Sequence, residues 1–289
     1  MTARLLHRPD ADRRGFAACF HTSSVVGYQE IETDYDVAGT PTHAKNPMRG
    51  FTFVPVSGAA VYALGDVKPT NFNAVDGEYL YQLAPASARP ADGQYIYLDL
   101  ANAKIALDTE DDEEAGALVG WWLNAVTGDD EDRCDTATFA VGSAFLGDFS
   151  QAANVSFTCA GAVPSTNINV NISGKVYPMF ANPIPKQITF GDVTIGNMMA
   201  VDGEFFYQLQ PTNARPADGQ YIYLDLANAK IALDTEDDEE AGALVGWWLN
   251  AVTGDDEDRC DTLPIKAGEA FIGSMGGNAN VVVSFPRGI

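Results

Sequence analysis

The chain has 289 residues, of which 46% are hydrophobic and 10% aromatic, and this composition is typical of a folded globular protein rather than a disordered one. Its formal net charge of -23 repels phosphate backbones and argues against nucleic acid as a partner. The sequence has no apolar run of about 18 residues, so no membrane span is expected.

An internal repeat organises the chain. Residues Ala88–Thr136 recur letter for letter as Ala214–Thr262, at an offset of 126. A period of this length corresponds to a whole domain rather than to a solenoid unit. We therefore expect a basic N-terminal tail or processing remnant at 1–23, a first β module at 24–162 and a second β module at 163–289.

The N-terminal tail carries arginines of the kind found at the start of a signal peptide. Its longest apolar patch, Phe16–Phe20, is too short for the apolar region of such a peptide. An export signal is therefore not demonstrated, and a truncated one that ends near Ser23 is the alternative.

Short segments rich in β-branched and aromatic residues follow the tail, separated by Gly, Asn, Asp and Pro. The expected strands are 25–32, 51–56, 60–64, 94–100, 104–107, 117–123, 143–147 and 154–158 in module 1, and 168–172, 179–184 and 188–193 in module 2. Residues 94–100 and 104–107 have the spacing of a β-hairpin. Residues 110–118 should form a loop with a single helical turn, because their acidic side chains repel at i,i+4. The predicted fold is all-β, with two tandem antiparallel sandwich or roll modules whose short linker, 161–166, should leave them in contact.

Several short motifs occur in the same order in both modules. Asn46–Met48 followed by Leu64–Val67 matches Asn182–Ile184 followed by Phe190–Val193, and each set precedes a Tyr-rich hairpin and a Gly-Trp-Trp strand. This order resembles tandem β-sandwich modules of secreted or surface proteins of bacteria, which have no assigned activity. The resemblance implies a secreted β module and no catalytic residues.

The four cysteines are distributed unevenly between the modules. Cys134 and Cys260 are repeat counterparts, whereas Cys159 has no counterpart in module 2. A Cys134–Cys159 disulfide is one interpretation, with Cys260 paired to Cys19 or to another chain. Unpaired thiols are the preferred interpretation, because a stabilising bridge should recur in both modules.

The four tryptophans occur as two adjacent pairs inside the repeated block. Because neighbouring strand side chains point to opposite faces, one Trp of each pair should enter the core and the other should face outward. An outward Trp beside a hairpin tyrosine would be able to stack on a sugar ring. The candidate ligand-binding residues are Trp121, Trp122, Trp247, Trp248, Tyr95 and Tyr221. The preferred alternative is that the outward Trp packs on a loop, the other module or another subunit.

Acidic side chains form two clusters in each repeated block, which carries thirteen Asp or Glu and only three basic residues. The candidate metal ligands are Asp108, Glu110, Asp112, Asp129, Asp130, Asp132, Asp234, Glu236, Asp238, Asp255, Asp256 and Asp258. The first cluster departs from an EF-hand loop, because Glu113 stands at the glycine position and Val119 at the bidentate position. An extended strand would separate the two clusters of a module by about 40 Å. Weak calcium binding is one interpretation, and solvated acidic loops are the preferred one.

Signatures of catalysis are scarce in the sequence. The three histidines, His7, His21 and His43, precede the first repeated block, and no nucleophile-elbow, zinc-protease or phosphate-loop motif occurs. We therefore predict a non-enzymatic structural or adhesive protein, secreted or at the cell surface, that uses no cofactor. The expected partners are a surface polymer, a glycan or a second copy bound through β edges. The alternatives are a carbohydrate- or calcium-binding module pair and, as a third class, a hydrolase with two catalytic carboxylates.

Overall fold

The computed structural model describes most of both modules. The described residues are 26–37, 40–52, 54–55, 61–84, 86–87, 89, 93–125, 132–150, 154–213, 215–217, 219–252, 256–276 and 280–287. The predicted tail at 1–23 lies outside them. None of the helices in this described part is long and apolar enough to cross a bilayer.

Module 1 contains a three-stranded sheet in the order β1-β12-β6, a five-stranded sheet in the order β4-β11-β7-β8-β9, and the strand pairs β10-β5 and β2-β3. Its strands are β1 (Val26–Glu32), β2 (Tyr35–Val37), β3 (Thr40–Thr42), β4 (Met48–Gly50), β5 (Val61–Ala63), β6 (Lys68–Thr70), β7 (Tyr79–Tyr81), β8 (Tyr95–Leu98), β9 (Gly120–Leu123), β10 (Thr138–Ala140), β11 (Ala144–Asp148) and β12 (Ser156–Ala162). Short 3-10 turns are η1 (Leu64–Asp66) and η2 (Ala74–Asp76).

Module 2 repeats this arrangement with a three-stranded sheet in the order β13-β22-β16, a five-stranded sheet in the order β14-β21-β17-β18-β19, and the pair β15-β20. Its strands are β13 (Ile168–Asn171), β14 (Met179–Ala181), β15 (Ile188–Thr189), β16 (Thr194–Gly196), β17 (Phe205–Tyr207), β18 (Tyr221–Leu224), β19 (Gly246–Leu249), β20 (Pro264–Ile265), β21 (Ala270–Ser274) and β22 (Val282–Phe285). Its 3-10 turns are η4 (Phe190–Asp192), η5 (Ala200–Asp202) and η6 (Asp256–Asp258). All pairings between these strands are antiparallel, so the all-β prediction is confirmed.

The strand predicted at 104–107 is wrong, because these residues belong to helix α1 (Leu100–Leu107), whose copy is α3 (Leu226–Leu233). Asp99 begins α1 as its N-cap by accepting a hydrogen bond from the backbone N–H of Asn102 at 2.7 Å. The segment is rich in Ala and Leu, which favour helix. Its apolar residues lie all around the helix, so the sequence shows no amphipathic periodicity.

The single helical turn predicted within 110–118 is present as α2 (Asp112–Gly116), and its copy is α4 (Asp238–Gly242). Asp111 caps α2 by accepting hydrogen bonds from the N–H groups of Glu113 at 2.8 Å and Glu114 at 3.2 Å. Acidic side chains at the start of a helix interact favourably with its dipole, which offsets their mutual repulsion.

The strand predicted at 51–56 is misplaced, because β4 ends before it and, of its described residues, only Val54 forms a bridge. The match of Asn46–Met48 with Asn182–Ile184 is also wrong in register. The N–H of Gly147 donates to the carbonyl of Pro47 at 2.9 Å, and the N–H of Gly273 donates to the carbonyl of Pro178 at 2.8 Å. Pro178 therefore takes the place of Pro47 in module 2.

The two modules meet through the edge strands β4 and β14 in a reciprocal arrangement. The N–H of Gly50 donates to the carbonyl of Gly268 at 2.8 Å, and the N–H of Ala181 donates to the carbonyl of Gly142 at 2.9 Å. Gly50 and Ala181 end β4 and β14, while Gly142 and Gly268 stand two residues before β11 and β21. Each module donates one backbone hydrogen bond to the other and accepts the equivalent bond in return. Such a reciprocal interface is two-fold and isologous. We call this contact the module junction.

Side chains repeat the two-fold relation at the module junction. The N–H of Leu209 lies 3.3 Å from the sulfur of Met48, and the N–H of Leu83 lies 3.2 Å from the sulfur of Met179. The buried cluster around them draws on both modules and consists of Met48, Tyr81, Ala144, Leu146, Ala181, Ala270 and Ile272. The main apolar core is also continuous across the two modules. The two modules are therefore in contact, as predicted, and they share buried apolar residues.

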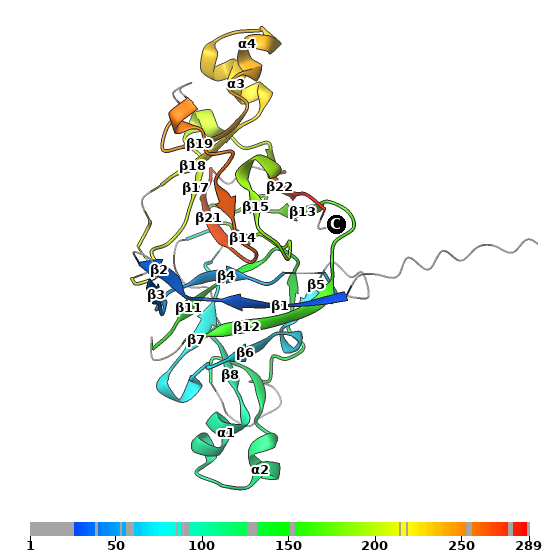
Figure 1. Cartoon of the computed structure of the whole chain (residues 1–289), viewed down its shortest axis with the longest axis vertical. Coiled ribbons are helices and arrows are strands. Elements are labelled where there is room, and N and C mark those ends of the chain that lie inside the picture. Colours follow the sequence, from blue (N-terminus) through cyan, green and yellow to red (C-terminus); the bar gives the residue numbers. More distant parts are fainter. Residues whose placement is uncertain are drawn as a thin grey trace, which may run out of the picture.

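The module junction places the two helix pairs at opposite ends of an elongated molecule (Figure 1). Helices α1 and α2 form one end, helices α3 and α4 form the other, and strand β4 lies between them near the middle. We call these ends the module 1 tip and the module 2 tip. Each repeated block thus forms the outer part of its module.

Close packing at the module junction leaves room for one methyl group. A Cβ atom added to Gly50 would lie 2.2 Å from the Cβ of Ala181 and 2.7 Å from the carbonyl oxygen of Ser143. We expect Gly50→Ala to lower the free energy of unfolding by about 1–3 kcal/mol, the usual effect of overpacking. The double variant Gly50→Ala/Ala181→Gly should recover part of that loss in a denaturant titration. Equal stability of Gly50→Ala and the natural protein would contradict the packing.

The described cysteines Cys134, Cys159 and Cys260 are free and buried, and Cys19 lies outside the described residues. Burial raises the pKa of each of these three thiols to about 12. Because the thiolate is the reactive form, they should react slowly with Ellman's reagent at neutral pH in the folded protein. Denaturation should release the full thiol content of the chain. Missing thiols after denaturation would contradict the unpaired state.

Candidate functional site

The prediction that one Trp of each pair faces outward is wrong. Trp121 and Trp122 are 0% and 1% exposed, and Trp247 and Trp248 are 2% and 1% exposed. Adjacent rings do point to opposite faces, but the second face is covered. Trp122 packs in a small core beneath the helix pair, together with Leu98, Ala103 and Ala115. The second Trp therefore packs against the helices of its own module, not against the other module.

The tryptophan rings also have polar partners inside the fold. The indole N–H of Trp121 donates to the carbonyl of Val67 at 3.0 Å. The guanidinium of Arg133 lies 5.1 Å from the ring centre of Trp122, a cation–π contact that recurs at 4.8 Å between Arg259 and Trp248. None of these rings offers a face to a ligand.

The candidate tyrosines Tyr95 and Tyr221 are half-buried and belong to aromatic clusters. Tyr95 packs edge-on against Phe139, with ring centres 5.4 Å apart. Tyr221 stacks on Phe190 at 4.5 Å and 20°. The structure therefore does not bring Tyr95 or Tyr221 together with an exposed Trp.

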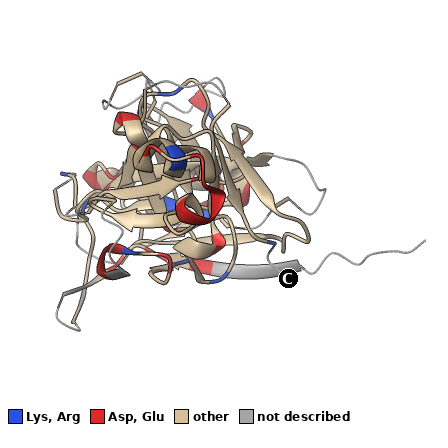
Figure 2. Cartoon of the chain, turned by 90° about the horizontal axis from the view of Figure 1, so that it is seen from above, with Lys and Arg blue, Asp and Glu red and all other residues tan. Residues whose placement is uncertain are grey.

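The described acidic candidates lie mainly at the tips. Asp108 ends α1, Glu110 is exposed in the next loop, and Asp112 forms an ion pair with Lys104. The same positions in module 2 are held by Asp234, Glu236 and Asp238, where Lys230 is the partner of Asp238. Seen from above the module 2 end, Asp and Glu stand out on the helical tip (Figure 2). The first acidic cluster is thus a helix-capping, largely solvated element.

The second acidic cluster is described only in part. Asp129, Asp130 and Asp255 lie outside the described residues, and Asp132, Asp256 and Asp258 lie within short 3-10 turns. Within the described residues, no three or more His, Cys, Asp or Glu side chains come together as a group able to hold a metal ion. Weak calcium binding stays a prediction.

Each tip also exposes apolar side chains that the sequence reading missed. In α1, Leu100, Ile105 and Leu107 are 39%, 64% and 39% exposed. In α3, the counterparts Leu226, Ile231 and Leu233 are 39%, 61% and 38% exposed. A helix that is apolar on all sides normally lies buried. We call these two sets the tip patches.

The outer edges of the five-stranded sheets are covered, which limits self-association through β edges there. Strands β4 and β14 meet at the module junction. At the opposite edge of the sheet of module 1, the N–H of Cys134 donates to the carbonyl of Trp121 at 2.9 Å, and the carboxylate of Asp135 accepts from the N–H of Trp121 at 2.9 Å. The same contacts recur in module 2. Covered edges are a common protection against aggregation.

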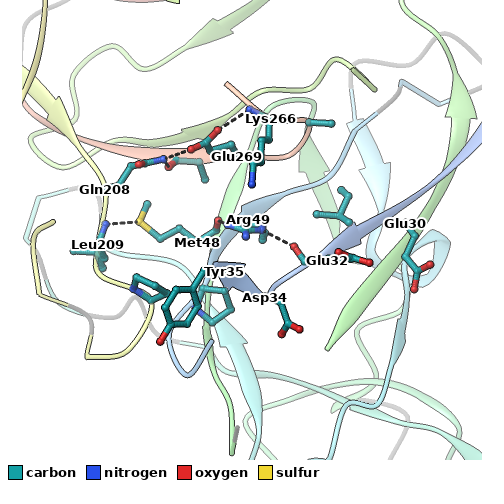
Figure 3. Close-up of a pocket in the computed structure, with 15 residues that line it drawn as sticks. Glu30, Glu32, Asp34, Tyr35, Met48, Arg49, Gln208, Leu209, Lys266 and Glu269 are labelled. Atoms are coloured by element: carbon teal, nitrogen blue, oxygen red, sulfur yellow. Dashed lines mark hydrogen bonds between the residues drawn. The ribbon is translucent and has the colours of Figure 1, made fainter. Parts of the chain in front are cut away.

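A pocket of about 540 Å³ opens at the module junction (Figure 3). Its walls come from the end of β1, the β2–β3 hairpin and β4 in module 1, and from 208–211 and 266–270 in module 2. The short connection between β13 and β14 has no counterpart of the β2–β3 hairpin. Among the described residues, the pocket wall formed by this hairpin therefore has no equivalent on the other side of the two-fold relation.

Arg49 is the half-buried cation of this junction pocket. Its Nε donates to the carbonyl of Glu32 at 2.9 Å and its Nη1 to the carbonyl of Met48 at 2.8 Å. Burial lowers the pKa of Arg49, and the carboxylates of Glu269 and Asp34 oppose that shift. The equivalent residue in β14 is Phe180, which is buried in the core.

Most carboxylates of the junction pocket already accept hydrogen bonds. Glu30 accepts from the hydroxyl of Ser156 at 2.5 Å, and Asp34 lies 3.0 Å from Nδ1 of His43. Glu269 accepts from the amide of Gln208 at 2.8 Å and from the N–H of Lys266 at 2.6 Å. Each of these contacts lies within one module, so the carboxylates Glu30, Asp34 and Glu269 are held by partners of their own module.

Buried carboxylates form a second pair of structural groups. Glu78 and Glu204 are each 3% exposed. Glu78 accepts from the N–H groups of Asn73 at 2.7 Å and Ser150 at 2.8 Å, and Glu204 accepts from the N–H groups of Met199 and Gly276. Both glutamates end a Val-Asp-Gly-Glu motif, which the sequence carries at 75–78 and 201–204.

No family model, curated protein or solved structure matches the chain.

The two cations of the junction pocket should differ in their effect on stability. We expect Arg49→Ala to lower the free energy of unfolding by about 1–3 kcal/mol, because the carbonyls of Glu32 and Met48 lose a charged donor. Lys266→Ala is the matched control, since Lys266 is exposed and should change stability by no more than about 0.5 kcal/mol. Thermal unfolding of both variants measures the difference. Equal effects of the two variants would show that the hydrogen bonds of Arg49 do not stabilise the junction pocket.

Proposed function

We propose that this chain is a non-enzymatic structural or adhesive protein, secreted or at the cell surface, that binds its partners through the two tip patches. The observation that carries the proposal is the exposure of the same apolar helix at both ends of one elongated body (Figure 1). The resemblance of the motif order to tandem surface modules supports the proposed setting.

The chemistry of the tips indicates the kind of partner. Ile105 and Ile231 are more than half exposed, and the capping residues beside them are acidic. An apolar centre with an acidic surround complements a partner segment that has an apolar anchor and basic neighbours. The net charge of each repeated block, -10, would speed the approach of such a partner.

Two identical tips on one body allow bivalent attachment. The module junction fixes the tips at opposite ends, so they cannot both contact one small partner. They are able to engage two sites on an extended surface or polymer, which raises the overall affinity without a new contact. Bivalent attachment is the role that we assign to the duplicated block.

The proposal predicts retention of the chain on a surface that carries an immobilised amphipathic lysine–leucine peptide. In surface plasmon resonance, Ile105→Asp or Ile231→Asp alone should speed dissociation, and the double variant should lose at least about tenfold in affinity. Leu263→Asp is the matched control, because Leu263 is an exposed apolar residue outside the tips. A double variant that binds the peptide as tightly as the natural chain would contradict binding through the tips. Cleavage of a polymer by the chain would contradict the non-enzymatic role.

A further inference from the structure

Module 2 carries a second hollow, distinct from the junction pocket. This groove has a volume of about 520 Å³, within the usual range of small-ligand sites. Its main lining side chains are Tyr177, Phe205, Tyr207, Gln220, Asn250 and Ser274. They come from the segment before β14, from β17, from the entrance to β18, from the end of β19 and from β21.

Three aromatic rings form one wall of the groove. Phe205 and Tyr207 alternate with the buried Phe206 along β17, so both point to the outer face of the sheet. Their ring centres lie 6.0 Å apart with a tilt of 50°. Tyr177 lies beside them: burial raises the pKa of Tyr207, and the nearby Tyr177 raises it further. All three rings are half-buried and keep an accessible surface.

Two amide side chains, those of Gln220 and Asn250, also line the groove. Asn250 is fixed in place, because its Oδ1 accepts from the N–H of Gln220 at 3.0 Å and its N–H donates to the carbonyl of Gln220 at 2.7 Å. Among the described residues, neither Asn250 Nδ2 nor the amide of Gln220 has a protein partner, so both can donate to a ligand. None of the described residues that line the groove is charged.

These groups match a neutral sugar ring. Such a ring has an apolar C–H face that packs on an aromatic plane and a rim of hydroxyl groups that pair with amides. A charged ligand would find no opposite charge among the described lining residues, whereas the rest of the chain is strongly acidic. We propose that this groove binds a neutral carbohydrate. The site goes beyond the proposed function, which depends on the tips alone.

Module 1 departs from this pattern at the equivalent positions. Asn46 takes the place of Tyr177 and uses its amide to donate to the carbonyl of Gly147 at 3.2 Å, while its N–H donates across the module junction to Pro211. Tyr79 takes the place of Phe205 and donates its hydroxyl to Asp148 at 3.1 Å. Module 1 thus has one ring fewer and a carboxylate instead of Ser274, so one carbohydrate site per chain is expected.

The test is calorimetric titration of the full chain with neutral oligosaccharides of glucose, xylose, mannose and N-acetylglucosamine. We expect saturable binding of at least one of them, at one site per chain. Phe205→Ala should weaken it by at least about tenfold, as for the loss of an aromatic anchor. Tyr79→Ala, the equivalent change in module 1, should leave the affinity unchanged.

Two further variants keep the test decisive if Phe205→Ala does not fold. Phe205→Tyr keeps the ring and should keep binding, whereas Ser274→Asp introduces the module 1 carboxylate and should weaken it. Absence of binding to every oligosaccharide, or binding that Ser274→Asp and Phe205→Ala leave intact, would overturn the inference. Ile231→Asp separates this site from the tips, since it should weaken surface retention and leave the calorimetric affinity unchanged.

Discussion

The main-chain contact between strands β4 and β14 is the constraint on which the rest of the structure depends. Each strand gives one N–H to a glycine carbonyl of the other module, at 2.8 and 2.9 Å. The backbones approach this closely because Gly50 has no side chain. The continuous core, the junction pocket and the opposed tips all follow from that approach, because it sets one module against the other about a two-fold relation.

The two-fold relation is imperfect at the junction pocket and at the groove of module 2. The equivalent of Arg49 in module 2 is Phe180, and the equivalent of Asn46 is Tyr177. The β2–β3 hairpin of module 1 corresponds to a short connection in module 2. These differences lie outside the repeated block. The block supplies the tips and the strand pairs β8–β9 and β18–β19, whereas the divergent part supplies the β2–β3 wall of the junction pocket and the aromatic rings of the groove in module 2. Repetition and divergence therefore have separate structural roles.

The sequence predicted the sheet structure better than the surfaces. Alternation of apolar and polar residues located β13, where Ile168 and Val170 are buried and the asparagines are exposed. Helix α1 was missed because its apolar residues follow no helical period, and the fate of Trp122 was missed because that helix covers it. The junction pocket and the groove join residues far apart in the chain, for example Arg49 and Glu269, and no local pattern reports such a contact. Their only sequence signal was that module 1 and module 2 differ there.

The methyl group of Ala181 also governs which modules are able to pair. Two copies of module 2 would bring two such methyls into a space that holds one, whereas module 1 would bring its glycine. The packing therefore disfavours contact between two copies of module 2, and it allows module 2 to pair with module 1 of its own chain or of another chain. Module 1 of one chain and module 2 of another would form the same contact, so exchange of modules between chains preserves the junction, and only pairing of module 2 with itself is disfavoured.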